Sequence, residues 1–224
     1  MKTRKLKFSA TPEHGKVSAI LLRPEDANIL LMLAHGAGND MRHPGQEKLA
    51  QALAQEGVAS LRYNFPYKEK GNRAPNTAKV MMHTVRSAVA AAAKAAPDLP
   101  LFAGGRSMGG RMTSLAASDD TLDGVRGIIF FGFPLHPAGN PGSERADHLK
   151  LVDLPLLFVS GTRDTLAGLD LLRPAVKKLG HRAQLHIVDE ADHSFKLLKR
   201  SERTEEGVYA EIAEAVSGWV DGII

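Results

Sequence analysis

Short apolar runs alternate along this chain with longer stretches in which apolar residues recur every three or four positions. The runs have the length of strands, and several are apolar throughout, which is typical of strands buried on both faces of a sheet. They predict strands at Leu6–Ala10, Val17–Leu22, Ile29–Ala34, Val58–Tyr63, Leu101–Gly104, Val125–Phe131, Leu156–Ser160 and Gln184–Val188. The stretches with helical spacing predict helices at Gly45–Gly57, Thr77–Ala96, Met108–Ser118, Leu169–Leu179 and Glu205–Val220. This alternation predicts an α/β fold, a three-layer α/β/α sandwich around a mostly parallel, twisted sheet of about seven or eight strands.

The segment Pro134–Asp153 joins two of these strands without a long helical pattern. It contains three prolines, and a short helix is expected at Ser143–Leu149. About twenty residues suffice for a rim but not for a separate lid, so we expect an open site. Because the chain shows no internal repeat and no long linker, we expect one domain over residues 1–224.

The composition is that of an ordinary globular protein, with 43% hydrophobic and 24% charged residues among 224. No apolar stretch approaches the length of a membrane span, and the basic N-terminus lacks the apolar segment of a signal peptide. We therefore expect a cytoplasmic protein without a membrane partner. The chain has no cysteine, which excludes disulfides, a thiolate nucleophile and zinc–thiolate sites.

The net charge is +4 and the isoelectric point is about 9.3. Basic residues are scattered, with modest clusters at 2–7 and 196–203. Nucleic-acid binding requires a concentrated basic stripe or a recognisable reading motif, and the sequence has neither. We interpret the charge as solvated surface and expect no nucleic-acid partner. The sequence leaves the oligomeric state open.

A G-x-S-x-G motif, Gly105-Arg106-Ser107-Met108-Gly109, directly follows an apolar run and leads into a helical stretch. This arrangement places the Ser107 hydroxyl on a sharp strand-to-helix turn, where it can act as a nucleophile. The strand and the helix approach each other closely at such a turn, so only very small residues fit two positions before and after the serine. Because the motif alone is common in loops, its meaning depends on a base, an acid and an oxyanion hole elsewhere.

Three further motifs each follow another candidate strand. His35-Gly36-Ala37-Gly38 follows the run at 29–34, Asp164 ends Gly161-Thr162-Arg163-Asp164, and His193 stands in Asp192-His193-Ser194-Phe195. Open α/β sheets place their active sites at the carboxyl ends of strands, where all these motifs lie. The chain order serine, aspartate, histidine is that of one hydrolase fold and differs from the chymotrypsin and subtilisin orders.

At these four motifs the chain resembles the α/β-hydrolase superfamily. It is most similar to the small, lid-less bacterial members related to dienelactone hydrolase, and to the testis-expressed and NSL-complex hydrolase-like group. The resemblance extends from about Lys5 to Ile224. It implies an α/β-hydrolase fold without a large lid, a Ser-His-Asp triad, and neither a metal nor another cofactor. Dienelactone hydrolases proper use a cysteine nucleophile, which this chain lacks, so their substrate does not carry over.

The expected roles follow from the chemistry of acyl transfer. Ser107 attacks a carbonyl carbon, while His193 takes the serine proton and later passes it to the leaving group. Asp164 holds the imidazole in the required tautomer and stabilises its cation. The backbone N–H groups of Met108 and Ala37 bind the developing oxyanion.

Other residues compete for some of these roles. Asp192 neighbours His193, but adjacent side chains usually diverge, and Asp153 precedes its strand instead of following it. Asp164 is therefore the preferred acid. His35 is expected to make structural hydrogen bonds in its turn, and the remaining histidines show no spacing of metal ligands.

Residues near the strand ends are candidates for contact with a substrate. They are His35, Gly36, Phe65, Arg106, Phe133 and His136. Arg106 and Arg111 can each bind a carboxylate or phosphate as a fork or form a structural ion pair, and the sequence does not decide between these roles.

We therefore expect a serine hydrolase that cleaves a small soluble ester, thioester or lactone through an acyl-enzyme. Hydrolysis of short peptides is the alternative within the same class. A catalytically idle scaffold that binds a small molecule or a protein is the alternative outside it. The intact set of three residues argues against the scaffold, because a retired enzyme usually loses one of them.

Overall fold

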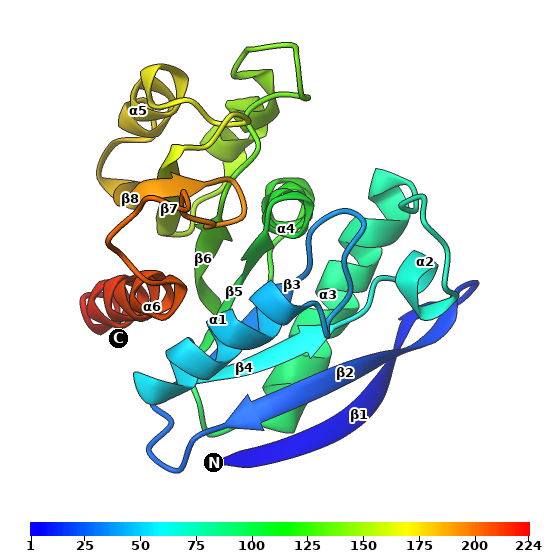
Figure 1. Cartoon of the computed structure of the whole chain (residues 1–224). Coiled ribbons are helices and arrows are strands. Elements are labelled where there is room, and N and C mark those ends of the chain that lie inside the picture. Colours follow the sequence, from blue (N-terminus) through cyan, green and yellow to red (C-terminus); the bar gives the residue numbers. More distant parts are fainter.

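Eight strands form one twisted sheet in the order β1-β2-β4-β3-β5-β6-β7-β8 (Figure 1). The computed structural model describes residues 1–224. β2 is antiparallel to both β1 and β4, and all other neighbouring strands are parallel. The strands are β1 (Lys2–Thr11), β2 (Gly15–Arg23), β3 (Ile29–Ala34), β4 (Val58–Tyr63), β5 (Leu101–Arg106), β6 (Val125–Phe131), β7 (Leu156–Arg163) and β8 (Ala183–Asp192).

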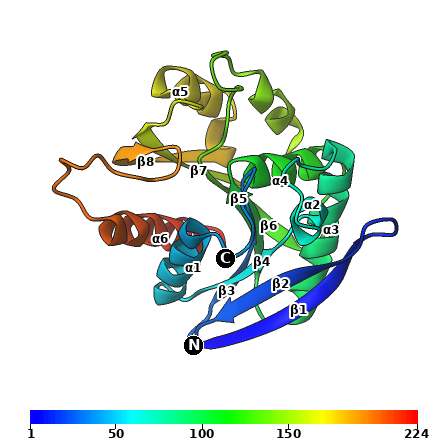
Figure 2. The ribbon, with the colours of Figure 1, turned by 45° about the vertical axis from the view of Figure 1, so that its right-hand side comes forward.

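Helices cover both faces of this sheet and complete three layers (Figures 1 and 2). α1 and α6 pack together on one face, while α3 and α4 pack on the other. The helices are α1 (Pro44–Gln55), α2 (Pro66–Glu69), α3 (Ala78–Ala95), α4 (Met108–Asp119), α5 (Leu169–Lys177) and α6 (Glu205–Asp221), with 3₁₀ helices η1 (Glu144–Leu151) and η2 (Gly180–Arg182). No helix combines the length and the apolar character that crossing a membrane requires.

Alternate side chains of the central strands enter two different cores. In β3, Leu30 and Met32 pack toward α3 and α4, whereas Leu31 and Leu33 pack toward α1 and α6. Every residue of β3 is buried. This two-sided burial explains why β3 is a continuous apolar run in the sequence.

The expected three-layer α/β architecture is confirmed, with eight strands and no large lid. The strands at Ile29–Ala34, Val58–Tyr63 and Val125–Phe131 have the expected bounds. β1 is longer than Leu6–Ala10, because its first residues pair with β2 while their polar side chains stay exposed. The helix Pro66–Glu69 is additional, since a single helical turn contains no apolar repeat.

The parallel strands all end at the same edge of the sheet, and this edge collects the four motifs. The turn that begins at His35 follows β3, Ser107 follows β5, Asp164 follows β7, and His193 follows β8. Between β6 and β7, the segment after Phe133 contains only η1 as regular structure. The site is therefore bordered by loops and helix ends and not by an inserted domain.

Candidate active site

Ser107 lies on the turn between β5 and α4 in a backbone conformation that L-residues rarely adopt. Its φ is 48° and its ψ is −115°, a strain of about 1–3 kcal/mol that the surrounding packing must hold. Two glycines make the close approach possible. A Cβ at Gly105 would lie 2.6 Å from the carbonyl oxygen of Ala34, and a Cβ at Gly109 would lie 2.6 Å from that of His35. The sequence expectation of small residues at these positions matches this crowding.

Ser107, His193 and Asp164 form one chain of hydrogen bonds. His193 Nε2 lies 2.8 Å from Ser107 Oγ, and His193 Nδ1 lies 2.9 and 2.8 Å from the two carboxylate oxygens of Asp164. A carboxylate only accepts, so Nδ1 carries the proton and Nε2 is free to accept from the serine hydroxyl. The Asp164 side chain is fully buried, and its Oδ1 also accepts from the N–H of Leu166 at 2.8 Å. The structure thus brings the three residues together in the order required to move a proton away from a nucleophile.

The loop that carries His193 is folded back by the residue before it. Asp192 Oδ1 accepts hydrogen bonds from the N–H groups of Ser194 at 2.7 Å and Lys196 at 2.9 Å. Asp192 therefore shapes the loop, and the carboxylate that contacts the imidazole is that of Asp164.

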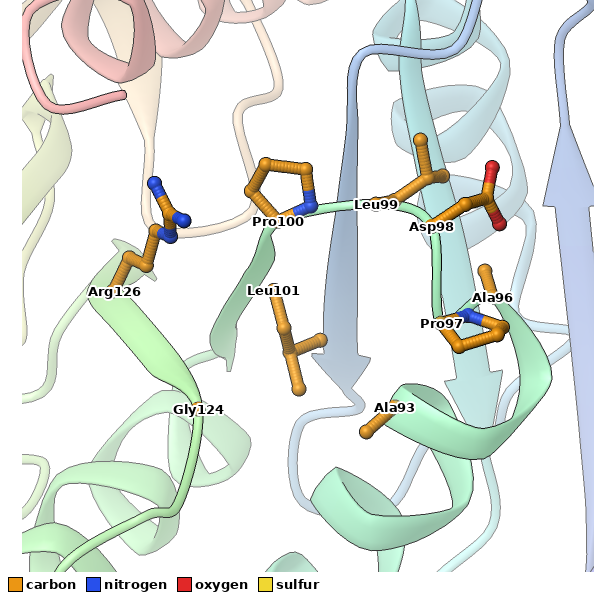
Figure 3. Close-up of a pocket in the computed structure, with 9 residues that line it drawn as sticks. All are labelled: Ala93, Ala96, Pro97, Asp98, Leu99, Pro100, Leu101, Gly124 and Arg126. Atoms are coloured by element: carbon orange, nitrogen blue, oxygen red, sulfur yellow. The ribbon is translucent and has the colours of Figure 1, made fainter.

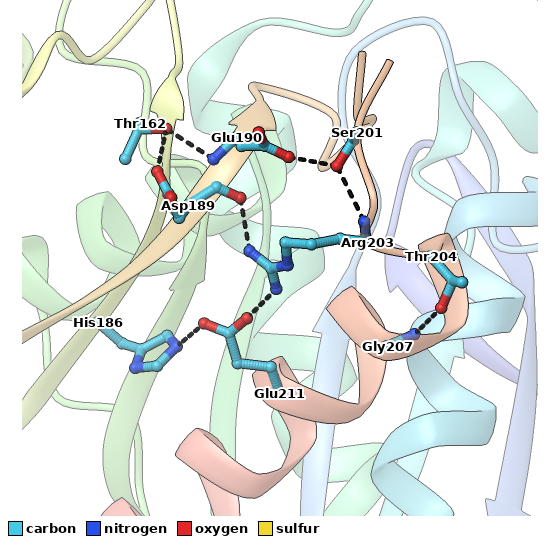
Figure 4. Close-up of polar contacts among 9 residues, drawn as sticks. All are labelled: Thr162, His186, Asp189, Glu190, Ser201, Arg203, Thr204, Gly207 and Glu211. Atoms are coloured by element: carbon cyan, nitrogen blue, oxygen red, sulfur yellow. Dashed lines mark hydrogen bonds and ion pairs between the residues drawn. The ribbon is translucent and has the colours of Figure 1, made fainter. Parts of the chain in front are cut away.

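A polar network fixes the far end of this loop between β8 and α6 (Figure 4). Arg203 donates to the carbonyl oxygen of Asp189 at 2.6 Å and pairs with Glu211 on α6. The same carboxylate lies 2.9 Å from Nε2 of His186 on β8. The loop 193–204 is consequently held at both ends, although it has no regular structure of its own.

The turn after β3 is fixed by the fully buried His35. Its Nδ1 lies 2.8 Å from the carbonyl oxygen of Gly36, and its Nε2 accepts from the N–H of Phe65 at 3.1 Å. This pair of contacts requires the neutral tautomer with the proton on Nδ1. Burial lowers the pKa of His35 to about 4, which keeps the ring neutral near pH 7. His35 therefore makes structural hydrogen bonds, as the sequence indicated.

Two backbone N–H groups near Ser107 donate no hydrogen bond to a backbone carbonyl oxygen of a helix or strand. Met108 is the first residue of α4, so its N–H lacks an intrahelical partner. Ala37 is exposed, and its N–H donates no backbone hydrogen bond. A Cβ on the neighbouring Gly36 would lie 3.7 Å from the Cβ of Ser107, so the turn runs directly beside the serine. Such free donors beside a helix N-terminus can stabilise a developing negative charge.

A cavity of about 440 Å³ opens beside Ser107 and His193. Only three of its fifteen lining residues are hydrophobic. The lining residues are Gly36, Ala37, Asn39, His43, Pro44, Gly45, Lys48, Arg106, Ser107, Leu166, His193, Ser194, Lys196, Glu205 and Tyr209.

Several of these residues were not identified from the sequence. Lys48 belongs to the first turns of α1, and Glu205 and Tyr209 belong to the first turns of α6. Both helices begin at the edge of the sheet where the strands end. A signal was present for α1, because Pro44 begins it only six residues after the turn at 35–38. The contribution of α6 depends on tertiary packing, which no local pattern reveals.

Gly36 and Arg106 line the cavity, whereas four other predicted substrate contacts do not. His35 and Phe65 pack edge to face against each other beneath the turn, and Phe133 packs against other aromatic rings of the core. His136 is buried, with Nδ1 close to the carbonyl oxygen of Pro137. These residues follow strand ends as expected, but their side chains point into the protein.

A second cavity, of about 370 Å³, lies at the opposite edge of the sheet, where β5 and β6 begin (Figure 3). It contains no serine or histidine; its charged side chains are Arg126 and Asp98, and Asp98 pairs with Arg23 at 2.5 Å. No group of three or more His, Asp or Glu side chains is arranged to hold a metal ion. The cavity at Ser107 is the candidate site, because it is lined by the hydrogen-bonded pair Ser107 and His193.

Comparison with protein families finds a match to an alpha/beta hydrolase domain over residues 27–221. The chain is similar in structure to a dienelactone hydrolase from Anabaena variabilis, with 19% identity, a TM-score of 0.77 and full coverage of both chains. It is also similar to a lid-less α/β serine hydrolase from Xanthomonas campestris, with 19% identity and a TM-score of 0.73, over 98% of this chain and 95% of the other. At such identities, these likenesses concern the fold alone.

Two curated Mycobacterium tuberculosis proteins that carry a provisional phosphoribosyl transferase name are 26% identical to this chain over 207 residues. The match covers 91% of this chain but only 43% of each relative. More than half of those proteins therefore lies outside the matched segment.

Proposed function

Because the chain belongs to the α/β-hydrolase domain family, we propose that it is a serine hydrolase of small soluble esters, thioesters or lactones. Ser107 is the nucleophile, His193 the general base and then the general acid, and Asp164 the residue that orients the imidazole. The N–H groups of Met108 and Ala37 form the oxyanion hole.

One observation carries this proposal: the hydrogen-bonded chain from Asp164 through His193 to Ser107, with each distance between 2.8 and 2.9 Å. The serine proton has an acceptor already in place, and the carboxylate that balances the resulting imidazolium is buried against it. Attack on the substrate carbonyl gives a tetrahedral oxyanion, which collapses to an acyl-enzyme as His193 protonates the leaving group. Water activated by His193 then releases the acid.

The cavity supports a small and polar substrate. Most of its lining residues carry a polar or charged side chain, and the short segment between β6 and β7 adds no apolar lid over it. Hydrolysis of short peptides would use the same residues and stays the alternative within the class. The transferase name of the two curated relatives belongs to proteins more than twice as long, and we propose no transferase function for this chain.

A fluorophosphonate probe tests the proposal, because it reacts only with an activated serine. We expect labelling of the wild type and turnover of 4-nitrophenyl acetate. Ser107→Ala should abolish labelling and reduce kcat by roughly 10⁶-fold. Ser118→Ala, in the last turn of the same helix, is the matched control and should keep both labelling and turnover. A folded wild type that is neither labelled nor active would refute the enzyme and favour a binding scaffold.

A further inference from the structure

Arg106, the residue before the nucleophile, is a buried cation without an anionic partner. The residue is only 7% exposed, yet it takes part in none of the ion pairs. Its contacts are with neutral groups, namely the Tyr209 hydroxyl at 3.3 Å, the Ser194 carbonyl oxygen at 2.8 Å and the face of the Phe195 ring. Arg62 is equally buried but has Glu47 at 3.5 Å. Buried charges in proteins are usually paired, so the unpaired Arg106 calls for an explanation.

The cavity beside Ser107 holds a second cation without a partner. Lys196 lines the cavity and forms no ion pair, whereas Lys48 is neutralised by Glu205 at 2.6 Å. His43 also lines the cavity; burial lowers its pKa, and the charges of Arg106 and Lys196 lower it further against the opposing effect of Asp40. Among the residues that line the cavity, three cations, Lys48, Arg106 and Lys196, therefore stand against one carboxylate, that of Glu205.

We propose that Arg106 and Lys196 bind a carboxylate group of the substrate, so that the protein hydrolyses small esters or lactones that carry a negative charge near the scissile bond. This inference rests on the proposed function. A guanidinium has five N–H donors in a planar fork, and Arg106 gives two of its nitrogens to neutral protein oxygens, which leaves donors for a bidentate carboxylate. Lys196 adds charge at the open side of the cavity, where its side chain is exposed.

The start of α1 leaves room for the guanidinium. A Cβ at Gly45 would lie 2.7 Å from Arg106 Nη1 and 3.1 Å from the Tyr209 hydroxyl. A larger residue at this position would push the guanidinium away from its place in the cavity. Gly45 of α1 and Tyr209 of α6 thus hold the guanidinium of Arg106, the last residue of β5, in place.

A purely structural role for Arg106 makes a different prediction. Its hydrogen bond to the Ser194 carbonyl braces the loop that carries His193, so loss of the arginine could slow every reaction alike. A carboxylate site instead predicts that loss of the arginine lowers kcat/KM for anionic substrates much more than for neutral ones. The discriminating quantity is the ratio of kcat/KM for an anionic ester to that for a neutral ester of the same shape.

Two substrate pairs measure this ratio. In the first, mono-4-nitrophenyl glutarate is compared with 4-nitrophenyl pentanoate, which places the charge on the acyl side. In the second, 4-carboxyphenyl acetate is compared with 4-carbamoylphenyl acetate, which places it on the leaving group. We expect the wild type to prefer the anionic member of at least one pair by about tenfold or more, as charge-assisted hydrogen bonds of this kind allow. Arg106→Gln should abolish the preference, and Lys196→Ala should reduce it by about threefold to fivefold. Lys199→Ala removes the same charge from the same loop outside the cavity and should leave both rates unchanged.

Binding provides a readout that does not depend on turnover. Glutarate at millimolar concentration should raise the melting temperature of the Ser107→Ala variant, whereas its dimethyl ester should not, and Lys196→Ala should weaken the effect. Equal rates on charged and neutral esters, together with no stabilisation by glutarate, would overturn the carboxylate site. If the fluorophosphonate probe still labelled the wild type at Ser107, the proposed serine hydrolase function would stand. A folded wild type that the fluorophosphonate probe does not label would instead refute the proposed function.

Discussion

His193 Nε2 lies 2.8 Å from Ser107 Oγ, although 86 positions separate the two residues in the chain. β6 and β7 lie between the strands that precede these residues, so the loop after β8 must reach back across two strand ends. Gly132, directly after β6, gives it space. A Cβ there would lie 3.1 Å from the His193 carbonyl oxygen and 3.3 Å from Nδ1.

Gly132→Ala should therefore impair activity by displacing the imidazole. Gly124→Ala is the matched control, because Gly124 has a similar positive φ, 76° against 72°, but open space around it. Both variants should lose about 1 kcal/mol of stability from the left-handed backbone. Only Gly132→Ala should also lower kcat on 4-nitrophenyl acetate, by about tenfold or more, since small misplacements of catalytic groups are costly. Equal kcat values for the two variants would show that the glycine does not position His193.

Asp164→Asn should preserve the fold and lower kcat by about 10³-fold to 10⁴-fold, because an amide favours the wrong imidazole tautomer. Asp153→Asn is the control. Asp153 is exposed and precedes β7, and it was one of the two other aspartates considered for the role of Asp164. Its kcat should match the wild type. A drop of less than tenfold in Asp164→Asn would mean that this buried carboxylate is not needed to orient His193.

The sequence predicted the central strands well for a physical reason. Ile29–Ala34 is buried on both faces, and such burial favours a continuous apolar run with sharp ends. Val58–Tyr63 is equally buried, although it includes Ser60 and Arg62. β1 was predicted too short because it lies at the edge of the sheet, where Lys2 and Arg4 pair through the backbone while their side chains remain exposed. An apolar pattern in the sequence indicates burial, so a strand with exposed side chains shows little of this pattern.

The candidate site was predictable to the extent that backbone topology determines it. Residues directly after parallel strands meet at one edge of the sheet, so the sequence alone predicted that Ser107, Asp164 and His193 lie close together. The structure places both Ser107 and Asp164 within hydrogen-bonding distance of His193. Side-chain direction was not predictable: Phe133 follows β6 yet points into the core. Tyr209 was missed because the packing of α6 beside the site depends on the whole helix, and not on a motif.

Gly105→Ala should destabilise the protein severely, by about 3 kcal/mol or more, because its Cβ would collide with backbone atoms that cannot move aside. The Cβ would lie 2.6 Å from the Ala34 carbonyl oxygen and 2.8 Å from the Gly109 carbonyl carbon. Gly218→Ala is the opposite case: it lies within α6 with open space around it and should stabilise by about 0.5–1 kcal/mol. Chemical unfolding of both variants measures the contrast, and a wild-type stability for Gly105→Ala would disprove the close strand–helix contact.

Stability should decline as pH falls from about 6.5 toward 4, and His35 should account for a large part of the decline. Its pKa is about 4 in the folded protein because of burial, whereas an unfolded histidine has a pKa near 6.5. Across this range the unfolded chain binds a proton that the folded one does not, so acid favours unfolding, and the loss reaches about 3 kcal/mol at pH 4. Protonation would also place an N–H of His35 against the N–H of Phe65, which now donates to it.

Urea unfolding of the wild type and of His35→Gln at pH 7.5 and pH 4.5 tests this linkage. Glutamine does not titrate, so the variant should lose stability at pH 7.5 but show a smaller further loss at pH 4.5. His148 adds a part that persists in the variant, because burial lowers its pKa to about 4 as well. His83→Gln changes an exposed histidine and should leave the pH dependence of the wild type unaltered. If the wild type and His35→Gln lost the same free energy between the two pH values, the acid sensitivity would have to arise elsewhere, and the neutral ring of His35 could not be what fixes the turn beside Ser107.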